Sequence, residues 1–384
     1  MNEYFVTGAT GVIGSAIADE LLARPDNRLT LLVRARSDAE LDARLGDLIR
    51  FWQRDPVATR ERVSTLRGDT TLPDFGLAAD AFERASRRCT HIVHCAAAVR
   101  MSLPLADARR SALGAAENVV GLAEACARHG ALRKVEFLST VGVGGRLPGR
   151  LPERFVTAPR AFHNTYEQSK AEAEDYLRDR IAQGLPATIH RPSMVVGDSR
   201  SGRTIHFQIF YHLVEFLTGA RTFGAFPAFG STRLDIVPVD YVAAAVAWSS
   251  EQAGTAGRVL HLCSGAEGSL PIGELQRRIR AQFAAAGARL PPVVRLPTAL
   301  FRAAAPIIGA FSPPAVRRAI ATLPIFLDYL AEDQAFENAA TRELLGGAGI
   351  ALPPVDGYLS NVLGYYLARR PQGHAKTRSP RAAP

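Results

Sequence analysis

The stretch Tyr4–Gly14, with the sequence YFVTGATGVIG, determines how the rest of this chain is interpreted. Its first residues are apolar and suit the end of a buried strand, whereas Gly8, Gly11 and Gly14 suit a tight turn that opens a helix. A strand, a glycine turn and a helix start bring backbone N–H groups onto a pyrophosphate. The spacing is G-x-x-G-x-x-G rather than G-x-G-x-x-G, and a turn that only ends a strand is the alternative. The stretch predicts a dinucleotide site made by Thr7, Gly8, Thr10, Gly11, Val12 and Ile13.

The composition is that of an ordinary globular chain, with 47% apolar and 22% charged residues among 384. This length suits one large α/β domain, or one domain plus a smaller cap. The formal net charge is +9, but five basic residues lie beyond residue 368. The rest of the sequence shows no basic stripe with interleaved aromatic residues, which argues against nucleic-acid binding. An acidic ligand such as a phosphorylated cofactor is enough to explain the charge.

The four cysteines, Cys89, Cys95, Cys126 and Cys263, form no C-x-x-C pair, and three of the four fall in apolar segments. This pattern indicates reduced thiols rather than a disulfide framework or a metal site. The chain enters a strand at once, so we expect no secretory signal, and it has no clean apolar run of 18 residues. We therefore expect a cytoplasmic protein without a bound metal.

Two arginines, Arg34 and Arg36, follow the second predicted strand, which spans residues 28–33. In dinucleotide-binding folds this strand ends at the adenosine ribose, where a carboxylate holds a free 2′-hydroxyl and arginine accommodates a 2′-phosphate. No carboxylate occurs before Asp38. The sequence therefore favours NADPH over NADH, with two solvated loop arginines as the alternative.

Two further segments are expected at the cofactor. Asp69 and Thr70 follow the third predicted strand, where the Asp either accepts a hydrogen bond from the adenine amino group or is a turn residue. His91 and His94 lie on the fourth predicted strand without a partner at ligand spacing, so we interpret them as core residues. The small residues after that strand let the chain pass close to a cofactor ribose: Ala96, Ala97 and Ala98.

Tyr166 and Lys170 lie four residues apart in a predicted helix that continues to about residue 182, so they share one helix face. An ammonium beside a phenol stabilises the phenolate and lowers its pKa, ordinarily near 10, towards the range that acid–base catalysis needs. Thr140, with Ser139 as the fallback, ends the fifth predicted strand, where a hydroxyl can hold a substrate oxygen. A core tyrosine beside a surface lysine is the alternative.

The glycine motif, the Ser139-Thr140 pair and Y-x-x-x-K follow one another as in the extended short-chain dehydrogenase/reductases, which the chain resembles over about residues 1–265. Further motifs make it similar to the thioester reductase and fatty acyl-CoA reductase, or male sterility, branch. These motifs are LVRARS at 32–37, RGDT at 67–70, NTYEQSK at 164–170, RPS at 191–193, GDS at 197–199 and DIVPVD at 235–240.

This resemblance implies an α/β fold with a doubly wound parallel sheet (Rossmann) and a smaller, mainly helical C-terminal region. It implies NADPH-dependent reduction of an acyl thioester to an aldehyde or alcohol, with Thr140, Tyr166 and Lys170 as catalytic residues. The sequence departs from the family at Ser111, where an asparagine is expected, so Ser111 and Asn118 are left out of the catalytic set. The resemblance adds four residues to the cofactor site: Lys170, Arg191, Pro192 and Ser193.

We expect three regions: an NADP-binding domain over 1–265 with substrate-binding insertions after about 197, a helical substrate region over 266–368, and a disordered basic tail over 369–384. The acyl group would arrive on CoA or on a separate acyl carrier protein. The apolar C-terminal third would cover the acyl chain, act as a plain structural cap or touch a membrane surface. Monomer and homodimer both stay open.

Other functions are compatible with the same fold. One alternative is a ketone or hydroxysteroid-type reductase, or a nucleotide-sugar epimerase, which the apolar C-terminal third disfavours. Another is a sensor that binds NADPH without turnover, although a sensor has no need for both Tyr166 and Lys170.

Overall fold

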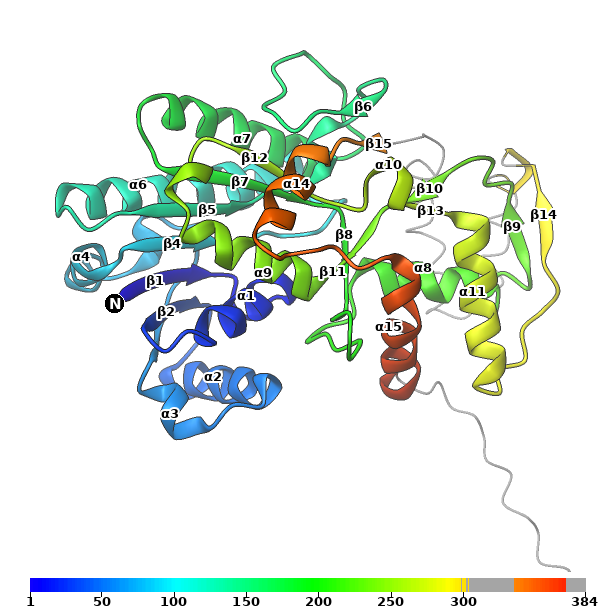
Figure 1. Ribbon diagram of the computed structural model, residues 1–384, viewed down its shortest axis with the longest axis horizontal. Helices are drawn as coiled ribbons and strands as arrows, with labels where there is room; N and C mark the ends of the chain where they lie inside the picture. The colour runs from blue at the N-terminus through cyan, green and yellow to red at the C-terminus, as the bar shows by residue number, and fades with distance from the viewer. Residues whose placement is uncertain (298, 302, 304–334, 371–384) are drawn as a thin grey trace, which may run out of the picture.

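The computed structural model describes residues 1–297, 299–301, 303 and 335–370 (Figure 1). Much of the predicted C-terminal helical region, over 304–334, lies outside the described residues, and so does the predicted tail from residue 371. The first two residues of the predicted tail are described: Arg369 ends the last helix, and Arg370 follows it. Within the described residues, no helix is long and apolar enough to cross a membrane.

A seven-stranded sheet forms the centre of the molecule, in the order β12-β7-β5-β4-β1-β2-β3 with every neighbouring pair parallel. Its strands are β1 (Asn2–Thr7), β2 (Asn27–Val33), β3 (Val63–Arg67), β4 (His91–His94), β5 (Lys134–Leu138), β7 (Ala187–Pro192) and β12 (Val259–Leu262). The strand order reverses between β1 and β4, and ligands bind at such a switch point, beyond the carboxyl ends of the strands. The predicted doubly wound parallel sheet is confirmed.

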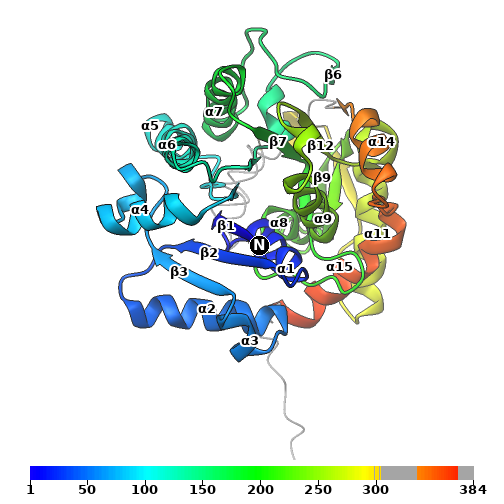
Figure 2. The same ribbon diagram turned by 60° about the vertical axis from the view of Figure 1, so that its left-hand side comes forward.

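Helices cover both faces of the sheet (Figure 2). Tyr4 and Val6 point to one face and Phe5 to the other, because successive residues of a strand alternate. The first face packs against α1 (Val12–Leu22), α2 (Asp38–Trp52) and α9 (Val239–Ser250). The second face packs against α4 (Ala79–Arg88), α6 (Ala115–Arg128) and α7 (Thr165–Ala182).

Two helices have starts of special geometry. The N-cap of α2 is Ser37, whose hydroxyl accepts a hydrogen bond from the backbone of Glu40 at 3.2 Å. Before α6, the helix α5 (Leu105–Arg109) passes into a π-helical turn (Arg110–Gly114). Such turns are rare and often lie at functional sites.

A second apolar core lies beside the sheet, on the right of Figure 1. It joins α8 (Ile209–Thr218), α11 (Ile272–Ala285) and α15 (Val355–Arg369) to β8 (Met194–Val196) and β11 (Ile236–Pro238). By contrast, α14 (Ala339–Gly347) returns to the sheet, where Leu345 joins the first core. The C-terminal region is therefore divided between both cores.

The remaining elements are short. They are α3 (Pro56–Arg60), α10 (Gly265–Gly268), β6 (Arg150–Leu151), β9 (Ala225–Pro227), β10 (Arg233–Leu234), β13 (Leu270–Pro271), β14 (Val294–Leu296) and β15 (Ala335–Phe336), with 3₁₀ turns at Pro73–Gly76, Val141–Gly144 and Ala253–Thr255.

Candidate active site

The turn between β1 and α1 requires its glycines. The backbone N–H of Gly11 donates to the carbonyl of Gly8 at 2.9 Å, and Gly8 has a φ of +74°. A Cβ on Gly8 would lie 2.6 Å from the backbone nitrogen of Ala96, and a Cβ on Gly14 would lie 2.3 Å from the carbonyl oxygen of Gly8. Larger residues at either position would push the turn away from β4 or from α1.

The N-terminus of α1 fits the pyrophosphate of a dinucleotide. Its N-cap, Gly11, has no side chain to satisfy the first N–H groups, and the first turn contains no acidic residue. These N–H groups and the positive end of the helix dipole favour an anion. Thr7 is an exception among the predicted ligands: its buried hydroxyl bonds Nδ1 of His94 at 2.9 Å, and so joins β1 to β4.

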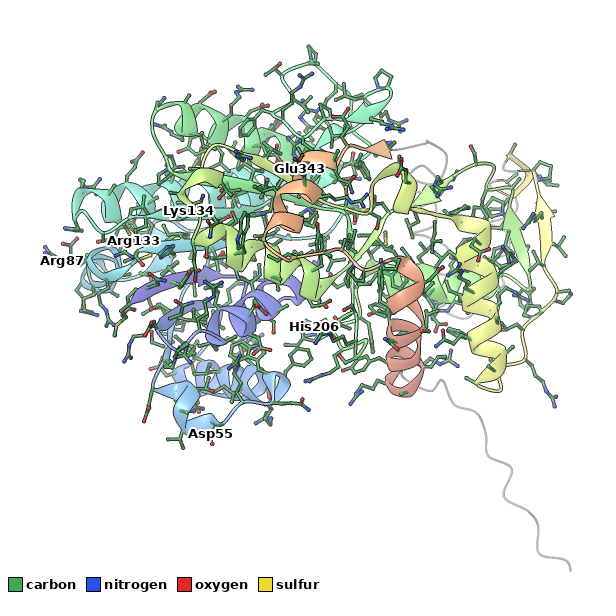
Figure 3. All side chains as sticks on the ribbon, viewed as in Figure 1. Asp55, Arg87, Arg133, Lys134, His206 and Glu343 are labelled. Carbon is green, nitrogen blue, oxygen red and sulfur yellow. The ribbon has the colours of Figure 1, made fainter. Side chains whose placement is uncertain are left out.

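His206, which the sequence did not single out, lies against the same turn (Figure 3). Its Nε2 donates a hydrogen bond to the carbonyl of Thr10 at 3.1 Å. The segment that carries it is attached to α2 by Arg203, which donates to the side chain of Gln53 at 2.7 Å. Only the folded chain brings this segment to the turn, nearly 200 residues after Thr10 in the sequence.

At the ends of β2 and β3 the predicted residues lie near one another. Arg34 is 78% exposed, and its Nη1 is 4.0 Å from a carboxylate oxygen of Asp69. The other oxygen of Asp69 accepts from the backbone and hydroxyl of Thr71, each at 2.9 Å. The carbonyl of Thr70 accepts from the amide of Asn118 at 2.9 Å, so Asn118 supports this loop.

The alanine segment after β4 passes directly over the glycine turn, as the contact between Ala96 and Gly8 shows. The backbone N–H of Ala98 donates to the hydroxyl of Ser111 at 3.0 Å. Ser111 belongs to the π-helical turn. The residue at which the sequence departs from its family therefore positions the alanine segment.

A cavity of about 200 Å³ lies beyond the carboxyl ends of β5 and β7. Six predicted residues line it: Ile13, Ser139, Thr140, Tyr166, Pro192 and Ser193. Sequence reasoning missed most of the apolar wall, which includes Val99, Met101, Ile209, Leu213, Leu234 and Phe336. These residues come from four separate segments, and no local pattern marks them.

Thr140 and Tyr166 both line this cavity, and the hydroxyl of Thr140 lies near the phenol of Tyr166. The Thr140 hydroxyl accepts from the backbone of Gly142 at 3.1 Å, whereas among the described residues the hydroxyl of Ser139 has no partner. Burial raises the pKa of Tyr166 to about 12, against the lowering effect of Thr140. The expectation that Lys170 lowers this pKa is therefore wrong for the structure described, and Tyr166 is a neutral phenol at pH 7.

Lys170 is 2% exposed, and its Nζ donates a hydrogen bond to the carbonyl of Leu138 at 2.9 Å. Burial lowers the pKa of Lys170 to about 8, although the carboxylate of Glu174 acts in the opposite direction. An ammonium has three N–H donors, so two remain for other partners. Lys170 is consequently a buried residue, not the surface lysine of the alternative interpretation.

Arg191 does not join the other predicted residues. Its side chain is fully buried and donates to both carboxylate oxygens of Glu174 at 3.0 and 2.6 Å, and to the carbonyl of Arg154 at 3.1 Å. Its neighbours Pro192 and Ser193 line the cavity, whereas Arg191 is not among the lining residues. The side chain of Arg191 thus forms a buried ion pair, and its place in the cofactor site stays a prediction.

Comparisons with known proteins agree with this geometry. The family model described as "Male sterility protein" matches residues 6–246. A glycine betaine reductase of Emericella nidulans is 28% identical over 274 residues, which cover 67% of this chain and 20% of that protein. An aldehyde reductase of Aspergillus flavus is 30% identical over 271 residues, 67% of this chain and 25% of that protein. The chain thus spans a fifth to a quarter of these curated relatives.

Among solved structures, the terminal R domain from the myxalamid PKS-NRPS biosynthetic pathway is similar along nearly the whole chain. The two superpose with a TM-score of 0.80 at 25% identity, covering 96% of this chain and 91% of that domain. The likeness therefore extends beyond the sheet, into the second core.

Proposed function

The chain belongs to the male sterility protein family, and from that premise we propose that it reduces an acyl thioester to an aldehyde or an alcohol with NADPH. Family membership and the fold make it an NAD(P)-dependent reductase of the extended short-chain type. The observation that carries the proposal is the cavity that Thr140 and Tyr166 both line, beside the start of α1. The acyl group would arrive on CoA or on a separate carrier protein.

The protein's own residues would act on the carbonyl oxygen of the thioester. A bound nicotinamide supplies the hydride for the carbonyl carbon. Tyr166, protonated at neutral pH, donates a hydrogen bond or its proton to the oxygen, and Thr140 donates a second hydrogen bond. Because the cavity wall is mainly apolar, these fixed donors stabilise the developing oxyanion more strongly than water would.

Loss of the thiol completes the first reduction. When the carbonyl of the tetrahedral hemithioacetal re-forms, the carbon–sulfur bond breaks and the aldehyde remains. The two remaining N–H groups of Lys170 suit the ribose hydroxyls of the cofactor. Because Tyr166 and Lys170 both belong to α7, this helix would hold the phenol and the cofactor in a fixed relative position. A second round on the aldehyde would give the alcohol.

The preference for NADPH is the finer part of the proposal. Arg34 and Arg36 follow β2, where the ribose of the adenosine binds in this fold. The exposed guanidinium of Arg34 suits a 2′-phosphate, because arginine binds phosphate with two parallel hydrogen bonds.

The experiment that tests the proposal measures NADPH oxidation and free thiol release together. The substrates are acyl-pantetheine thioesters, the matching aldehydes and ketones of the same chain length. We expect thioesters to be turned over with one thiol released for each carbonyl reduced. Turnover of ketones alone would contradict the proposal and favour the hydroxysteroid-type alternative.

A further inference from the structure

Arg67 is the last residue of β3 and lies in register with Val33 of β2. It therefore stands beside the strand end that continues into Arg34 and Arg36. The motif RGDT at 67–70 includes Arg67, but only Asp69 and Thr70 of that motif are predicted cofactor residues. Only the parallel pairing of β2 and β3 brings it to the same place as the two arginines of the predicted cofactor site.

The contacts of Arg67 are long. Its Nη1 lies 3.4 Å from the carbonyl of Arg36 and 3.9 Å from a carboxylate oxygen of Asp38, and its side chain is 51% exposed. Arg34 is equally loosely held, at 4.0 Å from Asp69. Within the part of the chain that the structure describes, both guanidinium groups thus keep donors that no partner at normal hydrogen-bond distance occupies.

A nearby ion pair provides the contrast, because its arginine has a carboxylate partner at normal hydrogen-bond distance. Arg44 contacts Glu40 through two nitrogens, at 2.7 and 3.1 Å. Among the described residues neither Arg34 nor Arg67 has such a partner, although both lie next to acidic residues. With Arg36, the ends of β2 and β3 hold three arginines against Asp38 and Asp69, and this excess of weakly paired positive charge favours an anion.

We propose that Arg67 is a third arginine of the site for the 2′-phosphate, acting with Arg34 and Arg36 from the neighbouring strand. The inference rests on the proposed preference for NADPH and goes beyond it, because it assigns cofactor specificity to β3 as well as to β2. A phosphate monoester offers three acceptor oxygens, enough for more than one guanidinium. Arg67 thus discriminates between the two cofactors without contacting the substrate.

The test uses 2′,5′-ADP and 5′-AMP as probes, which differ only in the 2′-phosphate. Their affinities are measured by isothermal titration calorimetry on the full chain, so no turnover is needed. We expect Arg67→Gln to weaken 2′,5′-ADP about tenfold and to leave 5′-AMP within about twofold. Arg67→Lys, which keeps the positive charge but not the planar guanidinium, should weaken the binding of 2′,5′-ADP about threefold.

Arg60→Gln is the matched control, because Arg60 is a similarly exposed arginine that pairs with Asp42 at 2.5 Å, away from the strand ends. It should change neither affinity. Equal weakening of both probes in Arg67→Gln, or unchanged 2′,5′-ADP binding, would overturn the inference. If the unmodified chain bound both probes equally, the NADPH preference itself would fail; if it preferred 2′,5′-ADP and Arg67→Gln kept that preference, only the role of Arg67 would fail.

Discussion

The two ends of the cofactor site differ in how they hold charge. At the catalytic end Lys170 is almost fully buried and Tyr166 lines a mainly apolar cavity. At the adenosine end Arg34 and Arg67 are mostly or half exposed, with partners near 4 Å. Water and salt screen exposed charges, whereas buried groups interact strongly. Single substitutions should therefore have large effects at the first end and small, additive effects at the second.

The largest effect is expected from Tyr166→Phe, which removes the hydroxyl and keeps the ring. Loss of a positioned proton donor costs about 10²–10⁴ in rate, so kcat/KM for a thioester should fall by that factor. Cofactor affinity should stay within about threefold, because the change leaves the glycine turn intact. Tyr176→Phe on the same helix is the control, since Tyr176 stacks against Arg180 away from the cavity. A loss of kcat/KM below tenfold in Tyr166→Phe would contradict the expected difference between the catalytic end and the adenosine end.

A comparable cost, in stability rather than rate, is expected from Glu174→Gln. This change leaves the fully buried Arg191 without its counter-charge, and breaking a buried pair costs about 3–5 kcal/mol. Glu172→Gln, two residues earlier in α7, breaks a partly exposed pair with Arg109 and should cost at most about 1 kcal/mol. Urea denaturation of both variants measures the difference. Equal losses in the free energy of unfolding would show that burial does not determine how much each ion pair contributes to stability.

A smaller effect is expected from pH. The pKa of Lys170 is lowered from 10.5 to about 8, so its ammonium form is present below pH 8 and is lost as the pH rises through that value. Single-turnover hydride transfer should fall about tenfold per pH unit above 8, since it needs the ammonium. The same shift makes the unfolded chain bind more protons between pH 8 and 10.5, so the cost to folding of burying this ammonium shrinks as the pH rises over that range. A rate that stays constant to pH 9.5 would rule out a role for the ammonium.

The smallest effect is expected at the exposed end. Arg34→Gln should raise the KM for NADPH by about tenfold or less and leave the KM for NADH within about twofold, because screened phosphate contacts contribute little individually. Measurements at 50 and 500 mM salt sharpen the comparison, since the effect should shrink as salt rises. An effect of Arg34→Gln that salt did not change would indicate a buried contact instead.

The sequence predicts best what local spacing determines. The glycines before α1, and Thr140 at the end of β5, follow from strand and turn patterns, and the structure places both as expected. The cavity wall was not predictable, because Met101 and Phe336 meet only through the tertiary fold. The buried ion pair of Arg191 with Glu174 was not predictable either, because the motif RPS does not say which of its side chains face the core.

The pKa of Tyr166 shows a second limit. Spacing along α7 places Lys170 on the same helix face, but it says nothing about burial. The structure buries both groups, and burial of the phenol raises the pKa of Tyr166 while burial of the ammonium lowers that of Lys170. Helical periodicity therefore locates catalytic groups without giving their protonation states.

The most direct test of the central claim is a crystal structure of the chain with NADP⁺ and an unreactive ketone analogue of an acyl-pantetheine thioester. The account predicts that the ketone oxygen lies within about 3.2 Å of the hydroxyls of both Tyr166 and Thr140, with the nicotinamide beside them. An analogue bound with its oxygen turned away from Tyr166, or with Lys170 out in bulk water, would contradict it.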